Sequence, residues 1–229
     1  MTTAGDHPFT SDLFVRLDET DDALFYAIPR KVVHLDEGAG AAASRFYGET
    51  LPPNGTLLDL MASWRSHLPA DLPRRRVIGL GMNAEEMSDN PDLDEWVVHD
   101  LNKQPALPFA EARFDGALLT VSVQYLVKPI EVFRSVARSL RPGAPFIVSI
   151  SHRCFPPKAV KIWQECRNMR ERMELAMAYF RFAGGFDAVQ GVDLRPEVRA
   201  GEDPVLAIFG KREGDAAGVR RPAAGWRRR

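Results

Sequence analysis

Residues 114–150, FDGALLTVSVQYLVKPIEVFRSVARSLRPGAPFIVSI, form the stretch that decides the fold. Its two apolar ends, 114–121 and 145–150, each predict a buried strand. Between them, Pro129 suits the first position of a helix, and apolar residues follow it at helical spacing. Arg141-Pro142-Gly143 closes that helix. The stretch is therefore a strand–helix–strand unit, which is typical of a parallel sheet covered by helices.

The same alternation continues on both sides of this unit. Upstream lie three further apolar runs, which predict strands over 56–61, 76–82 and 95–101. Downstream, a terminal pair of strands is expected over 186–194 and 203–211. Helices are expected over 31–47, 64–72, 84–90 and 159–182. This order predicts a doubly wound, mostly parallel α/β sheet with helices on both faces.

Composition limits the possible functions. The chain has 229 residues, 45% of them hydrophobic and 27% charged, with a net charge of -1. These values are those of one ordinary globular core, and they predict neither a nucleic-acid nor a membrane partner. The polar N-terminus does not resemble a signal peptide, and two cysteines are too few for a disulfide framework, which favours a cytoplasmic setting. No Cys/His cluster predicts a metal site.

The candidate site follows from the sheet. In an open parallel sheet, ligands bind beyond the carboxyl ends of the strands, near the point where the strand order reverses. The residues that follow the first four predicted strands are therefore the candidates: 59–65, 81–83, 100–102 and 120–125.

Short motifs around these positions resemble a known family. Asp100-Leu101-Asn102, Leu107-Pro108-Phe109, Phe114-Asp115 and Arg141-Pro142-Gly143 occur in an order and spacing similar to class I S-adenosylmethionine-dependent methyltransferases of the type 11 kind. In that family a second glycine follows the last motif, where this chain has Ala144. The similarity runs from about residue 55 to residue 211.

The resemblance implies a Rossmann-like, seven-stranded sheet whose last strand is antiparallel. It divides the chain into an N-terminal helical cap (1–54) and a methyltransferase-like domain (55–212). The remaining residues, 213–229, are rich in small residues and arginine, so we expect a disordered tail. The resemblance further implies S-adenosylmethionine as cofactor and methyl transfer to a small-molecule substrate, with no metal. The transfer depends mainly on positioning and desolvation, so no catalytic residue is named from the sequence.

The resemblance fails at the cofactor loop. The family's first loop reads approximately D-x-G-x-G-x-G, whereas residues 59–65 read DLMASWR, without a glycine. Gly81 stands where the family has an acidic residue for the ribose hydroxyls. On the matching positions, the implied cofactor-binding residues are Asp59, Met61, Ser63, Gly81, Met82, Asn83, Asp100, Leu101, Asn102 and Ser122.

Each of these residues also has an ordinary structural interpretation. Asp59 holds the cofactor loop or is a solvated acid, and Ser63 replaces a glycine contact or caps a helix. Asn83 takes over ribose binding or caps a helix, while Met82 packs on adenine. Asp100 accepts the adenine amino group and the Leu101 backbone N–H donates to the ring, or the pair forms a turn.

Three further groups of residues remain open. Ser122, Gln124 and Tyr125 lie near the transferred methyl group or serve packing and capping. His152, Arg153 and Cys154 supply a base, an anchor for acidic substrates and a thiol, or are structural. Tyr26, Arg30 and His34 cover the cofactor or pack an N-terminal helix.

Two functions are therefore predicted as alternatives. The first is a methyltransferase, and the second is an inactive binding or regulatory protein on the same fold, which the missing glycines favour. The dehydrogenase fingerprint and the Walker loop are absent, which argues against hydride transfer and phosphate binding. A cavity beside Met61 and Ser63 would favour the enzyme. If the side chain of Met61, Trp64 or Arg65 fills that cavity, the binding protein is favoured.

Overall fold

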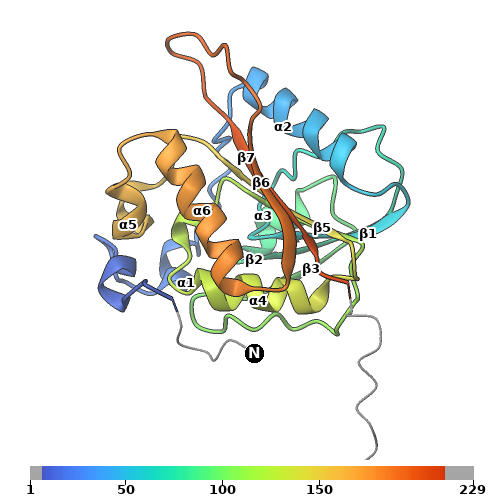
Figure 1. Ribbon diagram of the computed structural model, residues 1–229, viewed down its shortest axis with the longest axis horizontal. Helices are drawn as coiled ribbons and strands as arrows, with labels where there is room; N and C mark the ends of the chain where they lie inside the picture. The colour runs from blue at the N-terminus through green and yellow to red at the C-terminus, as the bar shows by residue number, and fades with distance from the viewer. Residues whose placement is uncertain (1–6, 215–229) are drawn as a thin grey trace, which may run out of the picture.

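The computed structural model describes residues 7–214, which build one seven-stranded sheet in the order β3-β2-β1-β4-β5-β7-β6 (Figure 1). The first five strands are parallel, whereas β7 is antiparallel to both β5 and β6. The predicted fold class is confirmed. The strands are β1 Gly55–Leu60, β2 Arg74–Gly81, β3 Glu95–Val98, β4 Gly116–Thr120, β5 Pro145–Ile150, β6 Phe186–Asp193 and β7 Leu206–Arg212.

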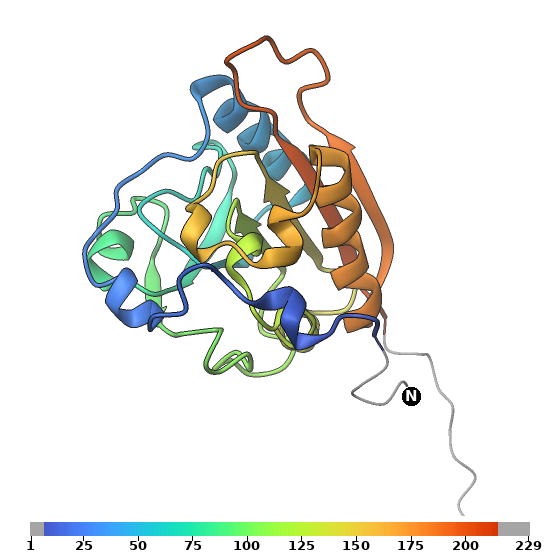
Figure 2. The same ribbon diagram turned by 90° about the vertical axis from the view of Figure 1, so that its left-hand side faces the viewer.

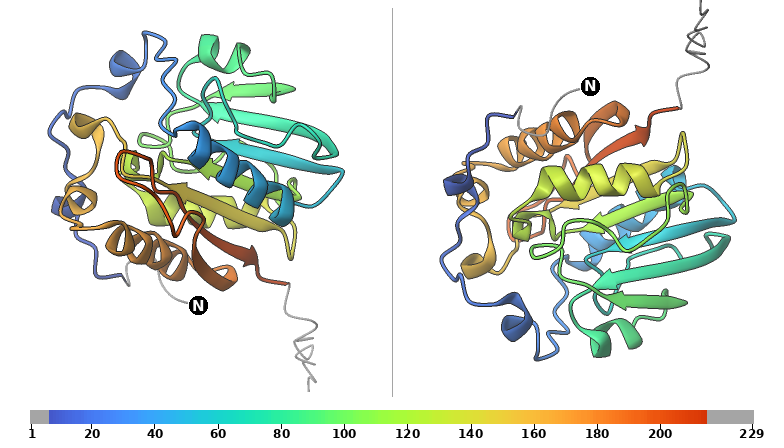
Figure 3. Two further views of the ribbon diagram at one scale, coloured as in Figure 1. Left: turned by 90° about the horizontal axis from the view of Figure 1, so that it is seen from above. Right: turned by 90° about the horizontal axis from the view of Figure 1, so that it is seen from below.

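Helices cover the two faces of the sheet, as Figure 3 shows. On one face lies α2, Glu37–Thr50, whose buried Tyr47 joins an apolar cluster with Leu57 of β1 and Ile147 of β5. On the other face, α4 and α6 bring Phe133 and Phe180 onto the sheet. The helices are α1 Asp22–Phe25, α2 Glu37–Thr50, α3 Ala84–Ser88, α4 Pro129–Ser139, α5 Lys161–Gln164 and α6 Met169–Ala183, with 3-10 turns at Ser11–Phe14, Val123–Tyr125 and Pro156–Lys158.

The prediction of a helix over residues 64–72 is wrong. A loop without a helix joins β1 to β2 across residues 61–73. His67 has a left-handed backbone (φ 58°), and Pro69 has no N–H to donate, so neither fits a regular helix. Leu68 and Leu72 are buried against the sheet, and their four-residue spacing imitates a helical pattern.

Three other predicted boundaries also change. The helix expected from residue 31 begins at Glu37, because the Asp36 side chain accepts a hydrogen bond from Ala39 N and caps it. The long helix over 159–182 is divided into α5 and α6, and Asn168 caps the second. The strand expected to reach residue 101 ends at Val98.

The N-terminal segment, residues 9–36, runs across the molecule from α6 toward α3 (Figure 2). Arg16 pairs with Val160 in an isolated antiparallel bridge, and Asn83 donates to the carbonyl oxygen of Tyr26. Helix α2 packs directly on the sheet and shares one apolar cluster with it. The expected domain boundary at residue 54 therefore runs between two parts of the same core. The tail expected from residue 213 lies outside the described residues from residue 215 on.

Candidate functional site

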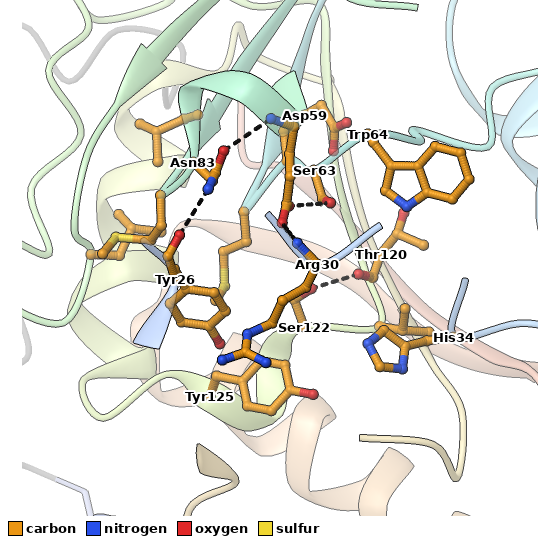
Figure 4. A pocket seen from close by; sticks show the side chains of 18 of the residues that line it. Tyr26, Arg30, His34, Asp59, Ser63, Trp64, Asn83, Thr120, Ser122 and Tyr125 are labelled. Atoms are coloured by element: carbon orange, nitrogen blue, oxygen red, sulfur yellow. Dashed lines mark hydrogen bonds between the residues drawn. The ribbon is translucent and has the colours of Figure 1, made fainter. Parts of the chain in front are cut away.

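A pocket opens at the carboxyl ends of β1, β2 and β4, and residues of the N-terminal segment form part of its lining (Figure 4). Its empty volume, including the part open to solvent, is about 1140 Å³. Every residue that the sequence assigns to the cofactor lies in its lining: Asp59, Met61, Ser63, Gly81, Met82, Asn83, Asp100, Leu101, Asn102 and Ser122. Trp64 and Arg65 also lie in the wall, so the first loop borders a cavity rather than filling it.

The first loop turns sharply at Met61, which adopts a left-handed backbone (φ 57°) that favours glycine. The chain then crosses the end of β2, where Ala62 N donates to Leu80 O at 2.9 Å. A Cβ atom at position 81 would overlap the carbonyl oxygen of Ala62, and one at position 79 would collide with Leu93. Gly81 thus lets the first loop pass close over the end of β2, and Gly79 makes room for Leu93.

This crossing leaves backbone donors at the pocket. Among the residues that the structure describes, the N–H groups of Ser63, Trp64 and Arg65 have no hydrogen-bond acceptor. The Leu101 N–H, beyond β3, has none either. All four residues lie in the pocket wall, so these donors are available to water or to a polar ligand.

Glu86 provides a buried carboxylate that the sequence analysis missed. It lies in the first turn of α3, where its backbone N–H donates to the Asn83 side chain at 3.0 Å. Its carboxylate accepts from Ser63 Oγ at 2.6 Å and from Arg30 N. The carboxylate absent at position 81 is therefore replaced by another acid, five residues later, in the same pocket wall.

Asp59 lies beneath the first loop and is 2% exposed. Ser66 Oγ donates to its carboxylate at 2.6 Å, and Asn90 donates to that same Ser66 hydroxyl at 3.0 Å. Burial raises the pKa of Asp59 to about 7; the Ser66 bond lowers the pKa and Asp92 raises it. Asp59 is thus a buried support of the loop, not the solvated acid that was its alternative.

The segment after β3 forms the turn that was one of its two interpretations. The Asp100 carboxylate accepts from Asn102 N at 2.9 Å and from Lys103 N at 3.2 Å. The Asn102 amide donates to Asp22 and Tyr125 O, so its donors are in use. A turn does not preclude ligand binding, because the second Asp100 oxygen has only an ion pair with Lys103 Nζ at 3.8 Å among the described residues, and the Leu101 N–H is unpaired.

A buried charge cluster holds the N-terminal segment over the pocket. Asp22 accepts two bonds from Arg16 Nη1, both at 2.8 Å, and pairs with Lys158 Nζ at 3.2 Å. The Lys158 side chain is completely buried and also donates to Thr20 O at 2.6 Å. These contacts place Tyr26, Arg30 and His34 in the pocket lining, and their role in covering a cofactor stays a prediction.

The residues after β4 serve packing as well as the pocket wall. Ser122 Oγ donates to Thr120 O at 2.8 Å, and Gln124 Nε2 donates to Val121 O at 2.7 Å. Tyr125 lies in the wall, and its hydroxyl accepts from Phe155 N at 2.8 Å. Burial raises the pKa of Tyr125 well above its usual range, so it remains a neutral phenol at pH 7.

His152 and Arg153 are not part of the pocket wall and pair with a buried acid. Arg153 Nε donates to Asp203 Oδ1 at 2.7 Å, and His152 Nε2 lies 3.3 Å from the same oxygen. Asp203 also accepts from Asp36 N at 2.7 Å, which ties the start of α2 to the chain before β7. Burial raises the pKa of the Cys154 thiol. The structural interpretation fits these three residues.

Comparisons with known proteins agree with this fold. Residues 66–148, just over a third of the chain, match the family model described as a methyltransferase domain. The match begins one residue after the glycine-free stretch 59–65. The biotin biosynthesis bifunctional protein BioHC of Teredinibacter turnerae is 30% identical over 71 residues, which are 31% of this chain and 12% of BioHC. The similarity thus spans only a small part of that relative.

Solved structures are similar at the level of the fold. A complex of the Haloferax volcanii Trm112 methyltransferase activator with a methyltransferase gives 18% identity and a TM-score of 0.56, covering 78% of this chain and 92% of that chain. An S-adenosylmethionine-dependent methyltransferase from Mesorhizobium loti gives 19% and 0.52, covering 76% and 100%. The cyclase SpnF gives 13% and 0.56, covering 76% and 81%. The chain has the class I S-adenosylmethionine-dependent methyltransferase fold.

Proposed function

We propose that the chain binds S-adenosylmethionine in this pocket and transfers its methyl group to a small molecule. The observation that carries the proposal is the pocket itself. The ends of β1, β2 and β4 and the turn after β3 meet in one wall, with unpaired backbone donors and one buried carboxylate. Parallel sheets bind nucleotide-like ligands at this place.

The residues present fit the three parts of such a cofactor. The unpaired N–H groups of Ser63 and Trp64 suit a carboxylate. The Glu86 carboxylate has lone pairs left for hydroxyl groups, because Ser63 and Arg30 use only part of its capacity. Leu101 N–H and the Asp100 carboxylate suit the polar edge of a purine. When bound, the cofactor supplies an electrophilic methyl group on a sulfonium.

The chain's own contribution is to orient the acceptor and exclude water. The N-terminal segment covers the pocket and is fixed by the charge cluster at Asp22. His34 lies in the wall, and burial, with Arg153, lowers the pKa of its imidazole. Its ring is therefore neutral at pH 7 and can accept a proton from an acceptor group that reaches it.

A transfer assay tests the proposal against the inactive alternative. Protein would be incubated with methyl-labelled S-adenosylmethionine and a small-molecule extract, and labelled products would be counted. Label in a product, lost in a Glu86→Gln variant, is the expected result. A folded protein that binds the cofactor but labels nothing would favour the inactive alternative, a binding or regulatory protein on the same fold.

A further inference from the structure

Arg30 carries a guanidinium edge that the protein leaves unused. Its Nε and Nη2 donate to the carbonyl oxygen of Phe25 at 3.2 and 3.0 Å. Nη1 has no acceptor, and no acidic side chain lies within ion-pair distance, among residues 7–214. The guanidinium is 4.0 Å from the centroid of the Phe25 ring, which fixes its plane. A fixed, half-buried guanidinium with its Nη1/Nη2 edge free is suited to a bidentate carboxylate.

The acids of the pocket do not neutralise Arg30, because each has other partners. Asp22 is held by Arg16 and Lys158. Glu86 contacts only the backbone N–H of Arg30, not its guanidinium, and its second oxygen accepts from Ser63. The positive charge of Arg30 is thus available to a ligand in the pocket that it lines.

Flat rings stand next to this charge. Phe155 stacks on Tyr125 with centroids 6.1 Å apart, and His34 meets Phe155 edge-on at 4.7 Å. The Arg30 guanidinium carbon lies 5.8 Å from the Phe155 centroid. Phe155, Tyr125 and His34 all line the pocket, and Figure 4 shows Arg30, His34 and Tyr125 reaching it from the side opposite Asp59. Aromatic faces beside a fixed cation suit a planar ligand that carries a negative group.

We propose that the methyl acceptor is a planar aromatic carboxylate, whose carboxylate binds the Arg30 guanidinium and whose ring packs against Phe155 and Tyr125. That the bound carboxylate is the methyl acceptor rests on the proposed function. Binding of a carboxylate at Arg30 can be measured without the reaction. His34, at the edge of the same ring cluster, then lies where a hydroxyl or amine of the aromatic acid can give up its proton.

The cofactor also has a carboxylate, so the test must separate two sources of the same chemistry. Arg65 is the second arginine of the wall, stacked on Trp64 at 4.4 Å, and it too lacks an acidic partner among the described residues. It belongs to the first loop, beside the backbone donors of Ser63 and Trp64. We therefore assign the acceptor's carboxylate to Arg30 and expect Arg65 to affect only the cofactor.

The experiment uses matched pairs of acids and amides: benzoate, phenylacetate, cinnamate and indole-3-acetate, each with its primary amide. Binding to the full chain is measured by ligand-observed NMR, with and without S-adenosylhomocysteine. Arg30→Met is compared with Arg30→Lys, with Arg65→Met and with Arg45→Met, the last an exposed arginine of α2. Thermal unfolding confirms that each variant is folded.

At least one acid should bind about tenfold or more tightly than its amide. Arg30→Met should abolish that preference and leave the affinity for S-adenosylhomocysteine within about twofold, whereas Arg30→Lys keeps part of the preference and Arg45→Met all of it. Equal binding of every acid and amide would overturn the inference. So would a loss of S-adenosylhomocysteine binding in Arg30→Met with the acid preference intact. If the wild-type chain binds no S-adenosylhomocysteine, the proposed function fails. The comparison of acids with amides then still shows whether Arg30 forms a carboxylate-binding subsite.

Discussion

The carbonyl oxygen of Ala62 occupies the space that a side chain at Gly81 would need. The first loop turns at Met61 and passes over the end of β2, so the position that would carry an acid must be a glycine. Glu86, at the start of α3, then brings a carboxylate back to the same wall. The missing acid at position 81 is therefore a consequence of this backbone path, whereas the same path would favour a glycine at Met61.

Gly81→Ala tests this path. The added methyl group would overlap the Ala62 carbonyl, a backbone atom that cannot move alone, so we expect the free energy of unfolding to fall by about 2 kcal/mol or more. Gly40→Ala in α2 is the control, because its methyl group would meet His67 only at an ordinary 3.6 Å. That variant should be neutral or slightly stabilised. Equal urea midpoints for the two variants would show that the first loop does not pass close over Gly81 at the end of β2.

Glu86→Gln tests the relocated carboxylate. Removing the negative charge should weaken S-adenosylhomocysteine binding about tenfold or more, because the amide has fewer acceptor sites for hydroxyl groups. The neighbouring Glu85→Gln is the matched control, since Glu85 is exposed and lies outside the pocket wall. Calorimetric affinities should separate the two variants. An unchanged affinity in Glu86→Gln would assign the hydroxyl contacts to another group.

Asp59→Asn tests the buried support of the loop through pH. The folded-state pKa of Asp59 is raised to about 7 from 3.8. Ionisation of this buried carboxyl group therefore destabilises the folded state relative to the unfolded state. Between pH 3.8 and 7 the unfolded chain loses this proton while the folded chain keeps it, and stability falls as pH rises. Relative to Asp59→Asn, wild-type stability should therefore decline by about 3 kcal/mol between pH 5 and pH 8. A constant difference across that range would contradict the burial of this acid.

Asp22→Asn tests the attachment of the N-terminal segment. The change leaves the fully buried Lys158 and the Arg16 guanidinium without their shared carboxylate, which costs about 3 kcal/mol when a buried pair is broken. The segment should open, so trypsin should cut at Arg16 or Lys31 at least tenfold faster. Asp12→Asn, on an exposed acid of the same segment, should not change the cleavage rate. Equal cleavage in both variants would show that the charge cluster is not what holds the segment.

The sheet could be predicted because its central strands contain buried apolar runs; the bounds of β5, 145–150, agree with those expected. The region 64–72 could not, because the four-residue spacing of Leu68 and Leu72 imitates a helix although Pro69 and the left-handed His67 prevent one. The ten cofactor residues expected from the matching family positions all line one pocket, and their binding roles stay predictions.

Glu86 was missed for a different reason. Its contacts come from Ser63, 23 residues upstream, and from Arg30, 56 residues upstream, and no local pattern records such pairing. The only local signal was an acid in the first turn of a short helix, which the helix dipole already explains. A sequence suggests the elements that bear a site, but the contacts between those elements require the fold.

Calorimetric titration of the full chain with S-adenosylmethionine and S-adenosylhomocysteine tests the central claim most directly. We expect one site per chain with micromolar affinity, weakened in Glu86→Gln and unchanged in Glu85→Gln. The absence of heat with either compound, from protein that is folded by circular dichroism, would contradict cofactor binding and leave a methyltransferase fold with another ligand.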